Sequence, residues 1–306
     1  MIKKYLFKLK IIQLIIQFSK QIVIPGFDGM PLYGVANFFF TGIFKGAITT
    51  RASAISFNFF LAIFPAVIFS FTLIPYIPID NFQEVLMELL KNILPSKSYE
   101  ASISTIDDIV NRPRGGLLSL GFILALYFST NGINALIMAF NNTYHTIETR
   151  KGFMQRLISI VLVIILTILV FTAIVLLIGT NIFIDYISNA GLMNDGITIA
   201  LLKFSKWIIL IALCFFGTSF IYYLAPAKKL RYRFISAGSS LATILSVLAS
   251  VGFNFYANNF AKYNVLYGSI GTLLLILMWI YFNAIIILIG FELNASIYAA
   301  KKEHRQ

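Results

Sequence analysis

Residues 263–291 read YNVLYGSIGTLLLILMWIYFNAIIILIGF, and none of these 29 side chains is charged. A transmembrane helix needs about 20 consecutive apolar residues, so this stretch is long enough to cross a hydrocarbon core. It lacks the period-two alternation of barrel strands, and a chain in lipid must satisfy its own backbone hydrogen bonds, so a helix is predicted. The stretch ends at Glu292, a carboxylate whose presence in so apolar a chain calls for an explanation.

Five further charge-poor stretches precede this one. With 59% apolar and only 12% charged residues, the chain fits no soluble globular class. The predicted fold is all-α, a polytopic membrane helix bundle that occupies residues 48–300. Its six transmembrane helices are predicted at about residues 52–77, 115–140, 157–184, 205–227, 234–258 and 267–292.

The basic residues predict how the chain lies in the membrane. If the N-terminus is cytoplasmic, 17 of the 24 Lys and Arg fall on the cytoplasmic side. This bias favours cytoplasmic N- and C-termini, with residues 301–306 as a cytoplasmic tail. The isoelectric point near 9.7 then follows from topology. It is not evidence for nucleic-acid binding, although the cytoplasmic cations are expected to attract anionic lipid headgroups.

Two segments outside the spans have helical periodicity. In residues 1–47, a basic amphipathic stretch (residues 1–24) and an aromatic-rich stretch (PLYGVANFFFTGIFKG, residues 31–46) are predicted as helices in the cytoplasmic interface, separated by Pro25, Gly26, Gly29 and Pro31. The alternative for residues 1–24 is a poorly ordered tail. In the external loop 80–114, apolar residues at helical spacing on both sides of Pro95 predict two amphipathic helices.

Several predicted spans carry more polar side chains than lipid solvation requires. Proline in the first span predicts a kink, which serves either as shape or as a moving gate. Hydroxyl, amide and small residues in spans two and five either allow close helix packing or line a polar path. The candidate residues of such a substrate path are Arg51, Asn58, Pro65, Asn131, Asn134, Ser240, Thr243 and Asn254.

Glu292 is predicted to lie near the cytoplasmic end of the last span, at the depth of Arg51. Three roles are open for it: an ion pair with Arg51, Arg231 or Arg233, an ordinary solvated interfacial carboxylate, or a carboxylate that couples protons or substrate. The charges predicted at the inner mouth of the bundle are Lys228, Lys229, Arg231, Arg233 and Glu292.

Three separated segments resemble one family. They are TTRASAISFNFFLAIFPAVIF, YYLAPAKKLRYRFISAGSS and YNVLYGSIGTLLLILMWIYFNAIIILIGFELNAS. They look like the YihY/virulence factor BrkB family, once called ribonuclease BN, over roughly residues 35–300. The resemblance implies a multi-pass bacterial inner-membrane protein and brings no settled activity. Besides Arg51 and Pro65, the positions that match the family's motifs are Pro226, Tyr267, Gly268, Trp279, Glu292 and Asn294.

The residue inventory does not favour an enzyme. No metal-ligand spacing and no phosphate-binding glycine loop appears in the sequence, so no metal, cofactor or catalytic residue is predicted.

The leading hypothesis is a transporter or flippase-like exporter of an amphipathic or lipid-linked anionic substrate. The alternatives are a non-catalytic membrane scaffold that organises the envelope, and an ion or proton antiporter that uses Glu292. The expected partners are membrane lipids, a lipid-linked substrate, and a second copy of the chain or an envelope protein, with no nucleic acid.

Overall fold

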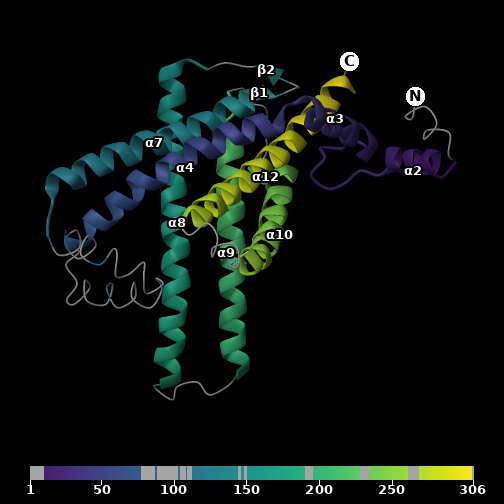
Figure 1. Cartoon of the computed structure of the whole chain (residues 1–306). Coiled ribbons are helices and arrows are strands. Elements are labelled where there is room, and N and C mark those ends of the chain that lie inside the picture. Colours follow the sequence, from purple (N-terminus) through teal and green to yellow (C-terminus); the bar gives the residue numbers. More distant parts are fainter. Residues whose placement is uncertain are drawn as a thin grey trace. The chain divides into compact units, whose positions relative to one another are not determined.

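A computed structural model describes residues 10–76, 112–143, 146–147, 150–189, 196–227, 234–260 and 269–304, together with Met87, Ile103 and Asp108. The chain is helical throughout these ranges apart from short connections (Figure 1). Within them, six helices are long and apolar enough to cross a membrane, which confirms the predicted fold class. The predicted external helices of residues 80–114 lie almost entirely outside the described residues.

Each predicted span corresponds to one helix. The first is α4 (Ile48–Leu73), which is continued by the short 3-10 helix η1 (Ile74–Tyr76), and the second is α7 (Gly115–Asn141). The third and fourth are α8 (Gly152–Asn189) and α9 (Gly196–Leu224). The fifth and sixth are α10 (Ala237–Phe260) and α12 (Ser269–Glu303). The helix α12 therefore continues eleven residues beyond position 292, where the predicted span ends.

The contacts divide the chain into two units, one of residues 1–56 and 133–306 and one of residues 57–132. In the second unit, the end of α4 runs against the beginning of α7. The rings of Phe69 and Phe122 lie 5.5 Å apart, and Gly121 allows the close approach because a Cβ there would lie 3.3 Å from the Phe69 backbone. The helix α4 continues through the buried Pro65.

In the first unit, α8 and α9 lie side by side as a long hairpin (Figure 1). The 38 residues of α8 correspond to about 57 Å of rise, more than the thickness of a hydrocarbon core. Only 6% of its most apolar window is buried in the protein, as expected for a helix that faces lipid. A two-residue ladder, β1 (Asn142–Thr143) with β2 (Thr146–Ile147), connects α7 to α8.

The N-terminal helices are α2 (Lys10–Gln21) and α3 (Leu32–Lys45). The helix α2 is strongly amphipathic, as predicted for residues 1–24, whereas its place in the cytoplasmic interface stays a prediction. Gly26 and Gly29 adopt positive φ in the turn between the helices, a conformation that glycine allows without strain. The helix α3 was predicted as a surface helix, but it packs along α12 and contributes Val35 to a core with Leu293 and Ile297.

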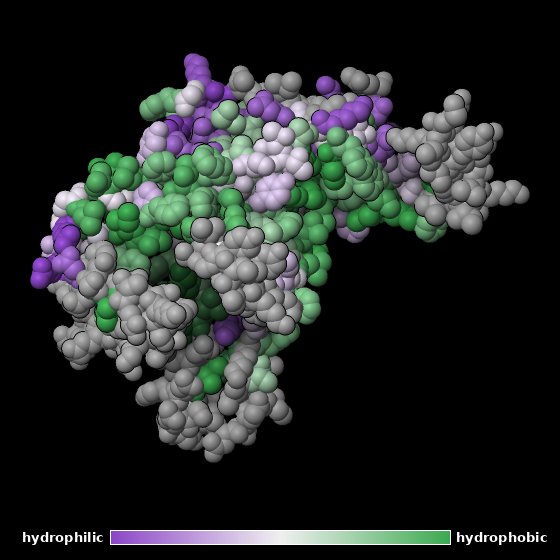
Figure 2. All heavy atoms as spheres, viewed as in Figure 1, coloured by the Kyte–Doolittle hydropathy of each residue, from purple (hydrophilic) through white to green (hydrophobic). Residues whose placement is uncertain are grey.

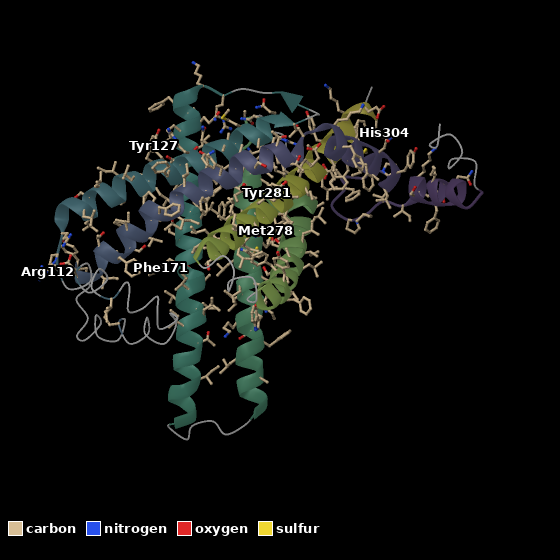
Figure 3. The ribbon with its side chains drawn as sticks, viewed as in Figure 1. Arg112, Tyr127, Phe171, Met278, Tyr281 and His304 are labelled. Carbon is tan, nitrogen blue, oxygen red and sulfur yellow. The ribbon has the colours of Figure 1, made fainter. Side chains whose placement is uncertain are left out.

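The described surface is mostly apolar. Figure 2 shows hydrophobic residues on the flanks of the helices, with hydrophilic residues gathered where α8 begins and α12 ends. Many large apolar side chains are exposed, such as Phe171 on α8 at 66% (Figure 3). A soluble protein rarely exposes so much apolar surface, whereas lipid tails solvate it.

Candidate functional site

The second half of α12 is deeply buried. Every residue from Gly290 to Ile297 is buried, because α3 and α10 both pack on this part of the helix. Three of these residues are polar: Glu292 and Ser296 are 0% exposed, and Asn294 is 4% exposed. Burying a charge or an amide is costly unless it has a polar partner, so the surroundings of these three residues identify the candidate site.

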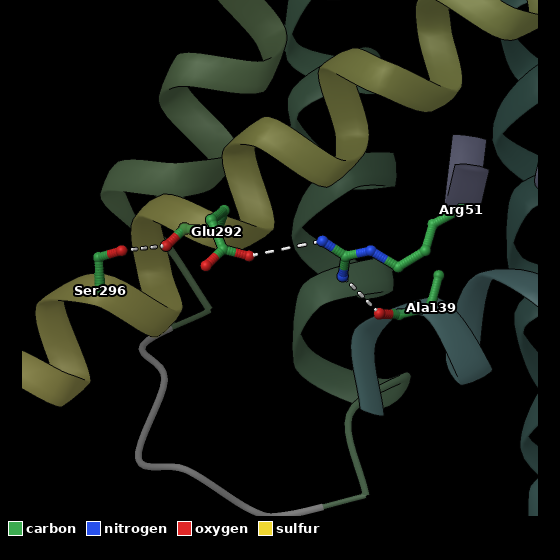
Figure 4. Close-up of polar contacts among 4 residues, drawn as sticks. All are labelled: Arg51, Ala139, Glu292 and Ser296. Carbon is green, nitrogen blue, oxygen red and sulfur yellow. Dashed lines mark hydrogen bonds and ion pairs between the residues drawn. The ribbon is translucent and has the colours of Figure 1, made fainter. Parts of the chain in front are cut away.

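Glu292 is paired with Arg51 of α4 (Figure 4). The distance between Arg51 Nη2 and Glu292 Oε2 is 3.9 Å, which is an ion pair without a direct hydrogen bond between the two atoms. Arg51 Nη1 donates a hydrogen bond of 2.8 Å to the carbonyl oxygen of Ala139. An ion pair with Arg51 was one of the three roles predicted for Glu292. A solvated carboxylate is wrong, since the Glu292 side chain is only 1% exposed.

The guanidinium of Arg51 has more N–H donors than it uses. Among the described residues, neither Nε nor Nη2 of Arg51 donates a hydrogen bond, although both atoms are buried. A guanidinium has five N–H donors in a planar fork that matches the oxygens of a carboxylate or phosphate. The site therefore contains a fixed cation that is able to bind an anion more fully than the present geometry does.

Two glycines, Gly42 in α3 and Gly46 directly after its end, lie against this ion pair. A Cβ at Gly42 would overlap the Glu292 carboxylate, and a Cβ at Gly46 would lie 2.9 Å from Arg51 Nη2. Only glycine allows α3 to lie so close to both charged groups. The sequence analysis missed this role, although the four-residue spacing in TGIFKG (residues 41–46) places both glycines on one helix face.

We expect Gly42→Ala to weaken the contact between α3 and α12. The added methyl group must displace either the helix or the carboxylate, and overpacking of this kind costs about 1–3 kcal/mol of unfolding free energy. Gly34→Ala is the matched control, because a Cβ at Gly34 on the same helix meets nothing within 4 Å. Thermal unfolding of both variants in detergent tests this, and equal melting temperatures would contradict the role assigned to Gly42.

Asn294 caps the beginning of α10. Its Oδ1 accepts a 2.9 Å hydrogen bond from the backbone N–H of Gly238, and its Nδ2 donates to Ser236 Oγ. Ser236 and Ser239 also bond reciprocally, each hydroxyl accepting from the other residue's backbone N–H. This is the capping-box arrangement, with serine in place of the usual glutamate. Asn294 thus connects α12 to the beginning of α10, where backbone N–H donors have no partner within the helix.

The end of α9 is fastened to α12 and to the segment between α7 and α8. Tyr222 donates a hydrogen bond of 2.7 Å to the carbonyl of Ile287 on α12. Arg150 donates 2.6 Å to the carbonyl of Pro226, and partial burial lowers the pKa of its guanidinium. The backbone N–H of Ala227 donates to Asn141 Oδ1. The family-like segment YYLAPA is therefore the anchored end of a helix.

Aromatic rings fill the space between these helices. The rings of Phe140 on α7 and Phe291 on α12 stack at 4.0 Å with an interplanar angle of 11°. The ring of Tyr222 lies 5.8 Å from that of Phe140. Further along α12, Trp279 packs against Phe253 of α10 at 4.8 Å.

The residues predicted to form a substrate path lie in different environments. Asn58 and Asn131 are half-buried, and Asn134 accepts a hydrogen bond from Gln155 Nε2. On α10, Thr243 is buried and Ser240 and Asn254 are exposed. The hydroxyls of Ser240 and Thr243 donate to carbonyls of their own helix.

Some predicted residues lie outside the described ranges. These are the cations Lys228, Lys229, Arg231 and Arg233 and the turn residues Tyr267 and Gly268. Within the described ranges, no group of three or more His, Cys, Asp or Glu side chains is placed to hold a metal ion. His304 lies at the end of α12, away from Met278 and Tyr281 (Figure 3).

Comparison with known proteins identifies a family for these segments. The sequence profile of the virulence factor BrkB family matches residues 39–306. The chain belongs to that family. The BrkB match begins within α3 and includes both partners of the buried ion pair. The resemblance inferred from the sequence is thereby confirmed.

Several curated proteins are similar to this BrkB-family chain. The putative ribonuclease-like protein YfkH of Bacillus subtilis is 32% identical over 261 residues, which cover 83% of this chain and 91% of the relative. The UPF0761 membrane protein NT05HA_1801 of Aggregatibacter aphrophilus is 26% identical and covers 85% and 90%. A UPF0761 membrane protein of Vibrio campbellii is 31% identical over 42% of this chain and 41% of its own length. Together with the six apolar helices, these relatives establish a multi-pass bacterial membrane protein. No solved structure matches the chain significantly.

Proposed function

We propose that this BrkB-family protein transports an amphipathic, anionic lipid-linked substrate, and that Arg51 and Glu292 form the polar site that responds to its headgroup. The observation that carries the proposal is the buried Arg51 guanidinium, which has two nitrogens that donate no hydrogen bond within the described chain and lies 3.9 Å from Glu292. Ionisable residues in membrane helices are costly, and they commonly mark substrate or ion pathways.

The proposed mechanism is an exchange of partners at Arg51. An anionic headgroup with phosphate oxygens accepts charge-assisted hydrogen bonds from the guanidinium fork more fully than a carboxylate at 3.9 Å does. Access to the pair requires α3 to move, because Gly42 and Gly46 lie directly against it. Opening of α3 and binding of the headgroup would therefore be coupled. The proposed role is transport without covalent chemistry, and membrane lipids are the expected partners.

The test is transbilayer movement of a fluorescent anionic phospholipid in reconstituted vesicles. The natural protein is expected to accelerate the movement, and Arg51→Lys to slow it about tenfold, because lysine keeps the charge but loses a fork hydrogen bond that contributes about 1.5 kcal/mol. Arg112→Lys is the control, since the Arg112 side chain is 77% exposed and far from Arg51 in sequence. Equal rates in vesicles with and without protein, for every lipid tried, would refute transport.

Two other activities give different results in the same preparation. If the protein is instead a proton antiporter, we expect a pH-linked flux that Glu292→Gln abolishes. Lipid movement is then absent. The name of the ribonuclease-like Bacillus relative suggests ribonuclease activity, which would appear as RNA cleavage by the purified protein.

A membrane scaffold is the second candidate, and the hydrogen bonds of α10 favour it. The hydroxyls of Ser240, Thr243 and Ser250 all donate within their own helix, as expected for a closely packed helix that conducts nothing. Water accessibility distinguishes the two candidates. In a Cys214→Ser background, labelling of Thr243→Cys by a water-soluble thiol reagent indicates a hydrated path. Protection of Thr243→Cys, with no lipid movement, indicates a scaffold.

A further inference from the structure

We propose that α3 is a lid over Arg51 and Glu292, and that an ion pair between Asp28 and Lys301 holds this lid shut. That an anionic headgroup enters beneath the lid rests on the proposed function. The structure adds the device that regulates access: a hinge at one end of α3 and an ionic catch, the pair Asp28–Lys301, at the other. Opening of the lid is measurable whether or not the protein moves lipid.

The helix α3 runs along the end of α12 in the opposite direction (Figure 1). The turn before α3 lies at the end of α12, because Asp28 Oδ2 accepts a hydrogen bond of 2.7 Å from Lys301 Nζ. Near the other end of α3, Gly42 lies against the carboxylate of Glu292. The part of α12 between these two contacts includes Ser296, which is 0% exposed. The closed lid therefore extends from the catch to the buried ion pair.

A break in the helix next to the buried ion pair provides the hinge. The helix α3 ends at Lys45 and α4 begins at Ile48, so Gly46 and Ala47 belong to neither. Ala47 has a φ of 48°, in the left-handed region that is unfavourable for a residue with a Cβ. Hinges are commonly a few residues at the ends of elements that absorb a change in φ and ψ. Rotation here changes the angle of α3 while both helices stay intact.

The catch at the other end of α3 is reversible. The side chains of Asp28 and Lys301 are 25% and 33% exposed, so water and salt weaken their attraction. Asp28 has a φ of 54° and lies between Gly26 and Gly29, which also have positive φ. This sharp turn places the carboxylate against the end of α12. A partly exposed ion pair contributes little to folding, so its loss is expected to release α3 without unfolding the chain.

Apolar contacts make the closed position the more stable one. Phe27 and Met30 of the turn and Val35 of α3 pack in one core with Leu293 and Ile297 of α12. Removal of the catch leaves the residues of this core unchanged. The open population should therefore rise only by about two- to fivefold, the factor that a partly exposed ion pair contributes to an equilibrium.

Labelling of a buried cysteine measures the opening in the full chain. In a Cys214→Ser background, Ser296→Cys places a thiol one turn beyond Glu292, on the same face of α12 (Figure 4). Asp28→Asn removes the charge and keeps a residue that tolerates positive φ. It should raise the rate of labelling by a water-soluble thiol reagent about two- to fivefold. Lys301→Gln and the double variant should give the same rate, because all three lose the same contact.

The matched control is Lys302→Gln, at the exposed lysine next to the catch, which should label like the parent. High salt should raise the labelling rate of the parent toward that of Asp28→Asn and leave this variant unchanged. Ile297→Cys, in the core shared with α3, gives the same comparison if Ser296→Cys does not fold. A labelling rate that Asp28→Asn does not change would overturn the lid, even in a protein that moves lipid. A rate that follows the catch without lipid movement would support the lid and count only against transport.

Discussion

Replacing Glu292 with Gln is expected to lower the free energy of unfolding by about 3–5 kcal/mol, because the substitution leaves the Arg51 charge buried without its anionic partner. The Arg51 side chain is only 12% exposed and its fork faces the carboxylate, so solvent cannot compensate. The glutamine amide fills the space of the carboxylate. The loss of unfolding free energy therefore measures the missing charge and not a change in packing. Thermal unfolding in detergent, together with the yield of folded protein, is the measurement.

A double substitution separates the structural role of this pair from its functional role. Arg51→Met combined with Glu292→Leu removes both charges, and buried ion pairs replaced by apolar residues of similar size are often neutral in stability or better. We expect the double variant to be more stable than Glu292→Gln and to be inactive in lipid movement. The control is Glu303→Gln, an exposed carboxylate on the same helix, which should unfold like the natural protein. A Glu292→Gln variant of unchanged stability would contradict the assignment of a buried ion pair.

A second large loss of unfolding free energy is expected when Gly238, where α10 crosses α12, is substituted. A Cβ at this position would overlap the backbone carbonyl of Gly290 and the side-chain amide of Asn294. A backbone cannot move aside as a flexible side chain does, so Gly238→Ala must force the two helices apart. We expect a loss at or above the upper end of the usual overpacking range of about 1–3 kcal/mol, and loss of the hydrogen bond from Gly238 to Asn294.

The matched control for Gly238 lies on the same helix. A Cβ at Gly252 meets nothing within 4 Å, so Gly252→Ala should be neutral or should stabilise α10 by up to about 1 kcal/mol through helix propensity. Melting temperatures of the two alanine variants give the comparison. If Gly238→Ala and Gly252→Ala unfold at the same temperature, the close crossing of α10 and α12 is not present in the folded protein.

Much of the fold follows from local properties of the sequence. Apolar runs of sufficient length predict the six helices, since each run by itself satisfies the requirements of a hydrocarbon core. The amphipathic helix α2 follows from its own periodicity in the same way. Helix ends are less predictable: α8 and α12 both extend past their predicted apolar runs, and the added turns of α12 carry Leu293 and Ile297, which pack in a core with Val35 of α3.

The contacts of the candidate site are harder to predict from the sequence than the helices are. Glu292 stands out because it ends a long uncharged run, and the analysis named Arg51 as one of three possible partners. The choice among arginines, the cover by α3 and the role of Asn294 as a cap of α10 involve residues separated by 56 to 250 positions along the chain. Such contacts leave no periodic signal, and Gly42 resembles any other helix glycine until its neighbour is known.

The amino-acid sequence by itself therefore determined that this chain is a helical membrane protein, because hydrophobicity and segment length act within each helix separately. Its membership of the BrkB family follows from the match of residues 39–306 to that family. Only the tertiary structure decided that Glu292 meets Arg51, and that Gly42 of α3 and the following Gly46 lie directly against this pair. The physical reason is that burial, ion pairing and close backbone approach are properties of pairs of helices, and they arise only when those helices pack.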